Sequence, residues 1–291
     1  MGMPRTPGRP ARSAATVDSI SREHDGTVQS LLRAMALLEV LSEDDEGYRL
    51  VDLAARAGLS TSTTHRLLTT LEQKQFVQFN RDTSLWFVGV RCFSIGSAFA
   101  RRRSFAALAL PFLRQLRDET GETVNLGLLD QGDVVFLTQV ESRELMRAIT
   151  RPGGRSPLPS TAMGQALLSA MSEPEIAEVL RQRLPRRTAN AIARPTALQG
   201  VIAATRARGY AIDDEENAVG LRCVAAPVFD EFRRPYAAIS IAGPSVRVTL
   251  RRIVELGPQV VAAARAITQA TGGLLPTSDP RSSRSPRTPS P

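Results

Sequence analysis

The residues with the most chemistry to offer are an acidic run over residues 213–216 and two cysteines, Cys92 and Cys223. Paired carboxylates can act as a general acid and a general base, but an acidic run in a loop is more often solvated surface. A cysteine nucleophile needs a base beside it, and the two histidines, His24 and His65, lie far from Cys223 in the sequence. The cysteines and histidines are also too scattered for a zinc site, which needs about four clustered ligands. We therefore expect no catalytic residue, no metal and no cofactor.

A second polar group has the pattern of a helix that reads DNA. The stretch Ser60–Leu68, STSTTHRLL, starts with small hydroxyl side chains and continues with a histidine and an arginine. Apolar residues at helical spacing put the polar ones on the opposite face, which suits the major groove, where arginine can pair with guanine. The alternative is that the hydroxyl groups only cap the helix. The predicted DNA contacts are Thr61, Ser62, Thr63, His65, Arg66 and Thr69 on this helix and Arg81 in the loop that follows it.

The elements around that helix have the order of a winged helix-turn-helix over residues 27–89. Gly58 is suited to end a short second helix, and Ser60 is suited to cap the third. A polar loop joins two β-prone runs into a wing, and Arg81 at its tip either contacts DNA or is an ordinary solvated arginine. The first helix is expected to bury the apolar residues that recur at three- and four-residue steps, namely Val28, Leu31, Leu32, Met35, Leu38 and Leu41. The other predicted bounds are 50–57 and 61–73 for helices, 76–79 and 85–88 for strands, and 90–103 for a linker helix.

A third candidate site is the small-residue segment Ser160–Gly164, STAMG, at the start of a predicted helix. The first main-chain N–H groups of a helix have no partner within it, and small side chains leave them open to a carboxylate. The alternative is that Ser160 or Thr161 simply caps the helix. The residues of this candidate site are Ser160, Thr161, Ala162, Met163 and Gly164.

The rest of the chain, residues 104–275, alternates helices with strands. Turn residues mark two hairpins, at 130–133 and 230–235, and adjacent hairpins mean antiparallel pairing. The predicted fold class is therefore α+β. The Pro-, Arg- and Ser-rich ends, residues 1–26 and 276–291, are expected to be disordered tails. The predicted helices are 105–120, 161–171, 173–182, 197–208 and 247–271, and the predicted strands are 123–129, 134–141, 222–229 and 236–242.

Composition narrows the class of protein. A chain of 291 residues, of which 42% are hydrophobic and 23% charged, favours two soluble domains. The net charge of +8 favours a polyanion such as DNA as a partner. No apolar run reaches the roughly 20 residues that span a bilayer, and no signal peptide is evident. We therefore expect a cytoplasmic protein without a membrane partner.

Six segments, in this order along the chain, resemble the IclR family of bacterial regulators over residues 27–273. They are VQSLLRAMALLEVL, LVDLAARAGLSTSTTHRLLTTLEQKQFV, TGETVNLGLLDQGDVVFLTQVES, GRSPLPSTAMGQALLSAM, RARGYAIDDEENAVGLRCVAAPVFD and AAISIAGPSVRV. The resemblance implies a sequence-specific transcription regulator with an N-terminal winged helix-turn-helix, a linker helix and a C-terminal α+β effector domain with a curved antiparallel sheet. It also implies double-stranded operator DNA as a partner, and homodimers that often pair into homotetramers.

The resemblance further implies an effector pocket. The segment Ser160–Gly164 would line it together with Asp213, Cys223 and Ser240, and the ligand would be a small carboxylate such as glyoxylate or pyruvate. Judged from the residues alone, Cys223 and Ser240 are ordinary small residues of apolar strands.

The chain departs from the family pattern at three places. Gln165 stands where a lysine is usual, and Lys74-Gln75 stand where a turn glycine is usual before the wing. Ala242 stands where a second serine is frequent, which leaves one polar contact fewer in the implied pocket.

A rival function is an enzyme or sensor whose C-terminal domain does chemistry while the helix-turn-helix binds another protein. That function requires a nucleophile, a base and an orienting group within reach of one another, and the sequence offers no such set. We therefore predict a regulator and not an enzyme. The sequence does not distinguish a repressor from an activator.

Overall fold

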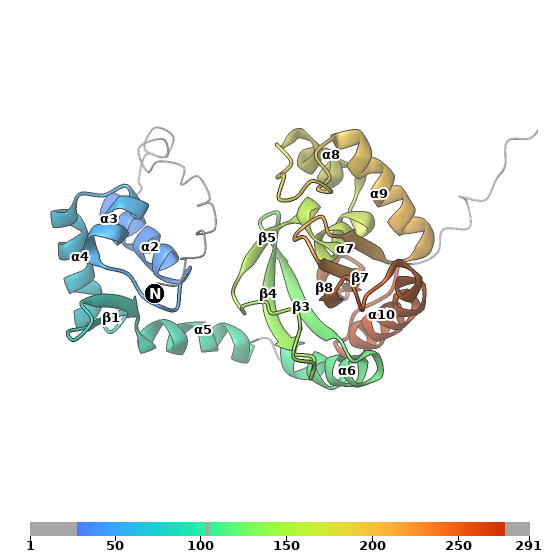
Figure 1. Ribbon diagram of the computed structural model, residues 1–291, viewed down its shortest axis with the longest axis horizontal. Coiled ribbons are helices and arrows are strands. Elements are labelled where there is room, and N and C mark those ends of the chain that lie inside the picture. Colours follow the sequence, from blue (N-terminus) through green and yellow to red (C-terminus); the bar gives the residue numbers. More distant parts are fainter. Residues whose placement is uncertain (1–27, 103–104, 277–291) are drawn as a thin grey trace, which may run out of the picture. The chain divides into compact units, whose positions relative to one another are not determined.

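The computed structural model describes residues 28–102 and 105–276 (Figure 1). The chain separates into two compact units, residues 1–103 and residues 104–291. The predicted N-terminal tail lies outside the described residues, and so do the predicted C-terminal tail from residue 277 onward and the side chains of residues 97–104. No helix within the described ranges is long and apolar enough to cross a membrane.

Within the described residues, the first unit has three helices, a β-hairpin and a fourth helix, which is the predicted order of a winged helix-turn-helix. Tyr48, just before the second of these helices, exchanges two backbone hydrogen bonds with Trp86 of the hairpin, at 3.1 and 2.8 Å. The hairpin is thereby fixed to the helices. The bounds are α2 (Gln29–Leu41), α3 (Leu50–Ala57), α4 (Thr61–Gln73), β1 (Val77–Asn80), β2 (Leu85–Val88) and α5 (Val90–Arg102).

The core of this unit lies where α2, α3 and α4 meet the hairpin, with Leu37, Leu41 and Leu68 among its buried side chains. The buried face predicted for α2 is partly wrong. Leu31 and Met35 are 55% and 49% exposed, whereas Leu37 is fully buried. Because α2 is apolar on almost every side, the spacing of its leucines does not select which face packs inward.

Tight turns fix both ends of α4. Gly58 takes a left-handed φ of 66° that ends α3, and the Ser60 hydroxyl accepts the Thr63 N–H to cap α4. Beyond α4, Gln75 takes a φ of 61°, in the place where the family pattern has glycine. The chain returns so close to Gln75 that a Cβ on Gly89 would lie 2.3 Å from its carbonyl oxygen. Residue 89 must therefore be glycine.

The second unit is a six-stranded, fully antiparallel sheet with helices on both faces. The strands lie in the order β5-β4-β3-β8-β7-β6, and Figure 1 shows the curvature of the sheet. The strands are β3 (Thr123–Asp130), β4 (Asp133–Val140), β5 (Arg155–Pro157), β6 (Ala211–Asp214), β7 (Leu221–Phe229) and β8 (Pro235–Pro244). The helices are α6 (Phe105–Thr120), the 3₁₀ turn η1 (Leu158–Ser160), α7 (Ala162–Ala170), α8 (Glu173–Arg181), α9 (Pro195–Arg208) and α10 (Leu250–Ala270).

The α+β class and the curved antiparallel sheet are as predicted. The two edge strands, β5 and β6, were not predicted, because each is only three or four residues long and β6 ends in two acidic residues. The expectation that residues 213–216 form a solvated loop is wrong for its first half: Asp213 and Asp214 belong to β6, and Asp213 is buried.

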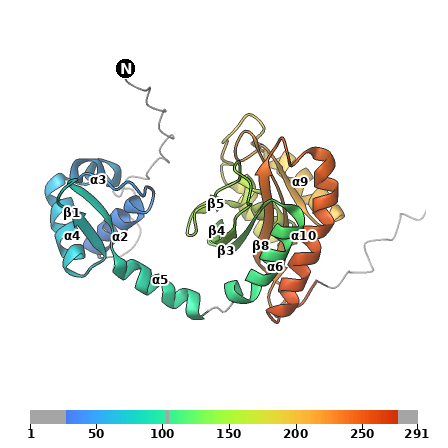
Figure 2. The same ribbon diagram turned by 60° about the horizontal axis from the view of Figure 1, so that its bottom comes forward.

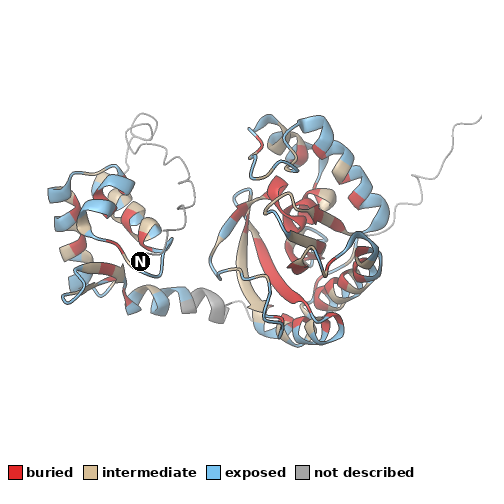
Figure 3. Ribbon diagram, viewed as in Figure 1, coloured by how far each residue is buried: buried red, intermediate tan, exposed pale blue. Residues whose placement is uncertain are grey.

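Alternate residues of each strand face opposite sides of this sheet. Helices α6 and α10 cover one face, over an apolar core (Figure 2). Helix α7 lies against the other face and is itself covered by α9, so that the central strands and α7 are buried (Figure 3). Gly127 of β3 lets α7 approach, because a Cβ there would lie 3.3 Å from the Met163 side chain and 2.5 Å from Val134.

A buried ion cluster joins the start of β3 to α10. Glu122 is 1% exposed, and Arg247 donates to its two carboxylate oxygens at 2.8 and 2.7 Å. Arg252 donates to the same carboxylate at 3.1 Å and also to the Thr120 carbonyl. The charge of Glu122 is thus compensated by two guanidinium groups, which offsets the cost of burying it.

Candidate functional sites

Helix α4 presents a polar outer face. Its inward residues Thr64 and Leu68 are buried against the core. Arg66 has no acidic partner within the described ranges, so its guanidinium group is available to a phosphate or a base edge. Of the predicted contacts on this helix, four are exposed, namely Thr61, Ser62, His65 and Arg66.

The remaining two predicted contacts on α4 are half-buried and already bonded. The Ser60 hydroxyl donates to Thr63 Oγ1 at 2.9 Å within the helix cap, and the Thr69 hydroxyl donates to the His65 carbonyl at 2.9 Å. Capping is therefore part of what this hydroxyl-rich segment does. Thr63 and Thr69 have less freedom to reach DNA than His65 and Arg66.

Arg81 lies at the tip of the β1–β2 hairpin and is exposed. The Asn80 carboxamide oxygen accepts the N–H groups of Asp82 and Thr83 at 2.9 and 3.2 Å, which makes the tip a defined turn. The wing thus carries Arg81 on a fixed loop.

In the second unit, polar residues gather on the sheet face that α7 covers. Asp213, Cys223 and Ala242 are in register across β6, β7 and β8. Ser240, two residues before Ala242 in β8, is in register with Asn125 of β3. Because residues two apart in a strand point the same way, all of these share one face. The three ligand residues expected from these strands therefore lie on the face that also meets α7.

The start of α7 is capped by Thr161. Its hydroxyl accepts the Gly164 N–H at 3.1 Å, and its carbonyl accepts the Gln165 N–H at 2.9 Å. The N–H groups of Ala162 and Met163 come first in the helix and have no acceptor within it. Gly164 is glycine for a packing reason, since a Cβ there would lie 1.9 Å from the Leu158 carbonyl oxygen of η1.

Three buried polar atoms on this side of the sheet have no hydrogen-bond partner among the described residues. They are Ser160 Oγ, beside the start of α7, Asn125 Oδ1 on β3 and Gln165 Oε1 on α7. A buried polar atom without a partner is unfavourable by about 1–3 kcal/mol, so each of these three atoms would be stabilised by a hydrogen bond to a polar molecule. Asn125 was not among the predicted residues. Its signal is a carboxamide at an inward position of an apolar strand, TVNLGLLD.

Asp213 is 1% exposed and bonded to the chain that follows it. Its Oδ1 accepts the N–H groups of Glu216 and Asn217 at 2.8 and 3.2 Å. Burial raises the pKa of Asp213 to about 6, against the lowering effect of those two hydrogen bonds. Asp213 is therefore a carboxyl group that changes charge near pH 6.

Glu216 lies against Asp213 and against α7. Gln165 donates from Nε2 to a Glu216 oxygen at 2.5 Å. Burial, and next the charge of Asp213, raise the pKa of Glu216 to about 7, while the Gln165 bond works in the opposite direction. Gln165, where the family usually has lysine, thus holds Glu216 without supplying a positive charge.

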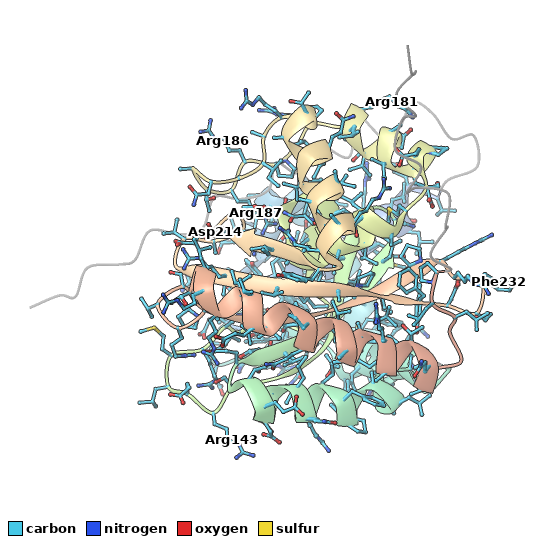
Figure 4. All side chains as sticks on the ribbon, turned by 90° about the vertical axis from the view of Figure 1, so that its right-hand side faces the viewer. Arg143, Arg181, Arg186, Arg187, Asp214 and Phe232 are labelled. Carbon is cyan, nitrogen blue, oxygen red and sulfur yellow. The ribbon has the colours of Figure 1, made fainter. Side chains whose placement is uncertain are left out.

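The connection between α8 and α9 is bonded to this acidic turn. Thr188 donates to the carbonyls of Glu215 and Glu216 at 2.8 and 3.0 Å. Asn190 donates to the Asp214 carbonyl at 3.3 Å, and Arg187 lies beside this turn (Figure 4). The turn that carries Glu216 is held from outside by a second loop.

Cys223 is half-buried between Asp213 and the apolar cluster under α7. Burial, and then the charge of Asp213, raise the pKa of its thiol well above the ordinary value. An uncharged thiol suits a weak hydrogen-bond donor and not a nucleophile. The described residues also contain no group of three or more His, Cys, Asp or Glu side chains able to hold a metal.

Comparison with known proteins covers both units. A family model for the bacterial transcriptional regulator IclR C-terminal domain matches residues 98–269, and one for the IclR helix-turn-helix domain matches residues 30–81. The acetate operon repressor of Salmonella typhimurium is 43% identical to this chain over 268 residues, which cover 91% of this chain and 96% of that protein.

Solved structures show the same fold. The IclR protein of Thermotoga maritima superposes with a TM-score of 0.68 at 30% identity, covering 84% of this chain and 98% of that one. An IclR homologue from Microbacterium hydrocarbonoxydans, solved in complex with 4-hydroxybenzoate, gives a TM-score of 0.71 at 24% identity, covering 83% and 98%. At that identity the second likeness concerns the fold alone.

Proposed function

This chain belongs to the IclR family of bacterial transcription regulators, and from that premise we propose that a small carboxylate sets its affinity for operator DNA. Its function is DNA-binding transcription regulation and not catalysis, since the proteins similar to it are named as repressors and regulators. The identity of the effector and the residues that bind DNA and effector are the new parts of this proposal.

For DNA, we assign base and phosphate contacts to the outer face of α4 and to the wing tip. Exposed His65 and unpaired Arg66 are the side chains best able to reach base edges, while Thr61 and Ser62 suit phosphate at the positive end of the helix. Arg81 on the wing would add a contact with the backbone or the minor groove. Thr63 and Thr69 are assigned weaker contacts, because their side chains are half-buried and their hydroxyl groups are bonded within the helix.

For the effector, the observation that carries the proposal is the unpartnered Ser160 hydroxyl beside the start of α7, with the unpartnered oxygens of Asn125 and Gln165 on the same side of the sheet. A carboxylate placed there would accept from the free N–H groups of Ala162 and Met163 and from the Ser160 hydroxyl. The helix dipole favours the negative charge at this end. Thr161 and Gly164 shape the site through the cap and through packing.

The strand residues would bind the remainder of the ligand. Cys223 and Ser240 offer side-chain donors, and Asp213 offers a carboxyl group to a hydroxyl or hydrated carbonyl at the end away from the ligand's own carboxylate. Glyoxylate and pyruvate are small enough for such a site. The alternative is a larger aromatic acid, because a homologue of the same fold was solved with 4-hydroxybenzoate.

Calorimetry with glyoxylate, pyruvate and 4-hydroxybenzoate tests the ligand class, with Ser240→Ala and Cys223→Leu as site variants. We expect the small acids to bind wild type and each variant to bind them more weakly. Binding of the aromatic acid alone would contradict the ligand class. Unchanged affinity in both variants would contradict the site.

A gel-shift assay tests the DNA assignment with the protein's own promoter region and with random DNA at increasing salt. A regulator forms a discrete complex with the promoter fragment that persists to higher salt than its complex with random DNA. Counterion release contributes to both complexes, whereas base contacts contribute only to the complex with the promoter fragment. Equal binding to both fragments would favour the rival function, in which the helix-turn-helix binds a protein. With effector bound, the affinity for operator should change by a coupling of about 1–3 kcal/mol.

The division of labour along the chain is part of the same proposal. We assign residues 27–89 to DNA binding, 90–103 to a linker and 104–275 to effector binding, in a homodimer or homotetramer. Such a protein works where bacterial DNA lies, in the cytoplasm. Two winged helices on one operator match a palindromic site and multiply the affinity of each.

A further inference from the structure

Asn125 is a buried carboxamide of which only half is used. The residue is 2% exposed, and its Nδ2 donates to Ser240 Oγ at 3.4 Å. Its Oδ1 is buried and has no partner within the described ranges. Asn125 therefore contacts a proposed ligand residue through its nitrogen, and its oxygen has no hydrogen-bond donor among the described residues.

Two polar neighbours on the same sheet face do not share this property. Gln139, in register with Asn125 on β4, donates to the Ala148 carbonyl at 3.2 Å and accepts the Thr150 N–H at 2.7 Å. Thr123 donates to the same Ala148 carbonyl at 3.0 Å and accepts the Ser142 N–H at 3.1 Å. These two side chains hold the loop after β4, so their presence on the face is explained by structure alone. The Asn125 oxygen has no such explanation.

The direction of the Asn125–Ser240 bond determines what each group can offer. Because Nδ2 donates to Ser240 Oγ, the serine keeps its own proton for an acceptor such as a ligand carboxylate or carbonyl. The free Asn125 Oδ1 then needs a donor. A simple oxo acid in its keto form has acceptors only, whereas a hydroxy acid or a hydrated aldehyde carries O–H groups.

We propose that Asn125 contacts the effector through Oδ1 and selects small carboxylic acids that carry a hydroxyl donor, either 2-hydroxy acids or the hydrated form of an aldehyde acid. This rests on the proposed function, because it takes the α7 face to be the effector site. Gln165 Oε1 on α7 is a second buried acceptor without a partner among the described residues. A ligand with an O–H group can satisfy such an acceptor and a keto group cannot, so glyoxylate, as its hydrate, should bind more tightly than pyruvate.

Pairs of acids that differ only by a hydroxyl group provide the test: glycolate with acetate, and lactate with propionate, each measured by calorimetry. Wild type should bind the hydroxy acid of each pair at least about tenfold more tightly, since a site built for a hydroxyl rejects the analogue that lacks it. In Asn125→Leu, which is nearly isosteric, that ratio should fall by about fivefold, the effect of one neutral hydrogen bond. Asn125→Ala should lower the ratio as well, and serves if the leucine variant does not fold.

Gln139→Met is the matched control. It also removes a carboxamide from the same face and should lower stability, but it should leave the ratio between paired acids unchanged. A ratio in Asn125→Leu and Asn125→Ala equal to that of wild type would overturn the proposal while leaving the effector site intact. If none of the acids binds wild type, the proposed small-acid ligand fails, which is a different result.

Discussion

Among single residues, Arg66 gives the most direct test of the DNA assignment. It lies opposite the buried Thr64 and Leu68 on α4 and has no acidic partner within the described ranges. If the side chain reads a guanine, Arg66→Ala should weaken operator binding by about 1–3 kcal/mol. If it contacts a phosphate, the slope of log affinity against log salt concentration should fall by about one. Thermal unfolding should be unchanged, because the side chain is not part of the core.

The control for Arg66 is Arg114→Ala, which removes the same charge from an exposed position of α6 in the other unit. Operator affinity in a gel shift should be unaffected by it. Equal affinity in the Arg66 and Arg114 variants would remove Arg66 from the interface, and a large fall in Tm would mean that α4 packs differently.

Asp213 gives a prediction about pH. Its pKa is raised to about 6 in the folded chain by burial, above the usual aspartate value near 3.9. The folded state therefore binds more protons than the unfolded state between those values, and the free energy of unfolding falls as pH rises through that window. Urea unfolding from about pH 4 to about pH 7 should show a loss of roughly 2–3 kcal/mol from this group.

Asp213→Asn isolates this effect, because asparagine keeps the Oδ1 acceptor for the Glu216 and Asn217 N–H groups and removes the charge. The variant should be less sensitive to pH than wild type and at least as stable near pH 7. Part of the slope should persist, since burial also raises the pKa of Glu216, to about 7. Identical pH profiles for variant and wild type would contradict the assignment.

At the scale of elements, the joint between η1 and α7 depends on Gly164. A methyl group there would lie 1.9 Å from the Leu158 carbonyl oxygen. Because that oxygen belongs to the backbone, it cannot move away by a change of rotamer as a side chain could. Gly164→Ala should therefore displace the start of α7, lower the stability by about 1–3 kcal/mol and abolish effector binding. Differential scanning calorimetry with and without ligand measures both.

Gly200 of α9 is the matched position for that experiment, since a Cβ there would meet nothing within 4 Å. Gly200→Ala should stabilise α9 by about 0.5–1 kcal/mol, because alanine is the better helix former. A destabilisation by alanine at both positions, or at neither, would show that the contact with Leu158 does not decide the effect.

The ion cluster around Glu122 makes a prediction for the joint between β3 and α10. Glu122→Ala would leave Arg247 and Arg252 without their shared carboxylate in a partly buried place. The free energy of unfolding should fall by about 3 kcal/mol. This is the low end of the range of about 3–5 kcal/mol for breaking a buried ion pair, because both arginine side chains are about 30% exposed. Chemical denaturation checks this. Effector and DNA affinity of the folded variant should be unaltered.

Helix and strand patterns in the sequence predicted most elements but not all of the contacts that matter. Residues 61–73 and 105–120 were predictable to the residue, because caps, glycines and apolar spacing agree there. β6 was not, because its acidic residues favour solvent locally, and only the sheet and α7 make Asp213 an inward position. Asn125 was missed for the same reason: its role arises from Ser240, 115 residues away in the chain. Site geometry of this kind depends on long-range register, which local patterns do not encode.

At the scale of the whole molecule, the proposed recognition of a palindromic operator predicts a homo-oligomer. One winged helix-turn-helix contacts a short half-site, and two half-sites on one palindrome need two chains. Light scattering at micromolar concentration should give the mass of a dimer or tetramer, with and without DNA. A monomer under both conditions would contradict the proposed homo-oligomer and leave the family assignment unchanged.

The two faces of the sheet in the second unit have a consequence for how this protein can evolve. Residues such as Asn125 and Ser240 face α7, while their immediate neighbours Val124 and Ile241 belong to the core under α6 and α10. Because adjacent positions along a strand face opposite sides, a substitution that changes the ligand leaves the other core untouched. Lineages can therefore exchange one metabolite for another without a new fold. Substitutions on the α7 face can therefore change the ligand while the core on the α6 and α10 face maintains the fold.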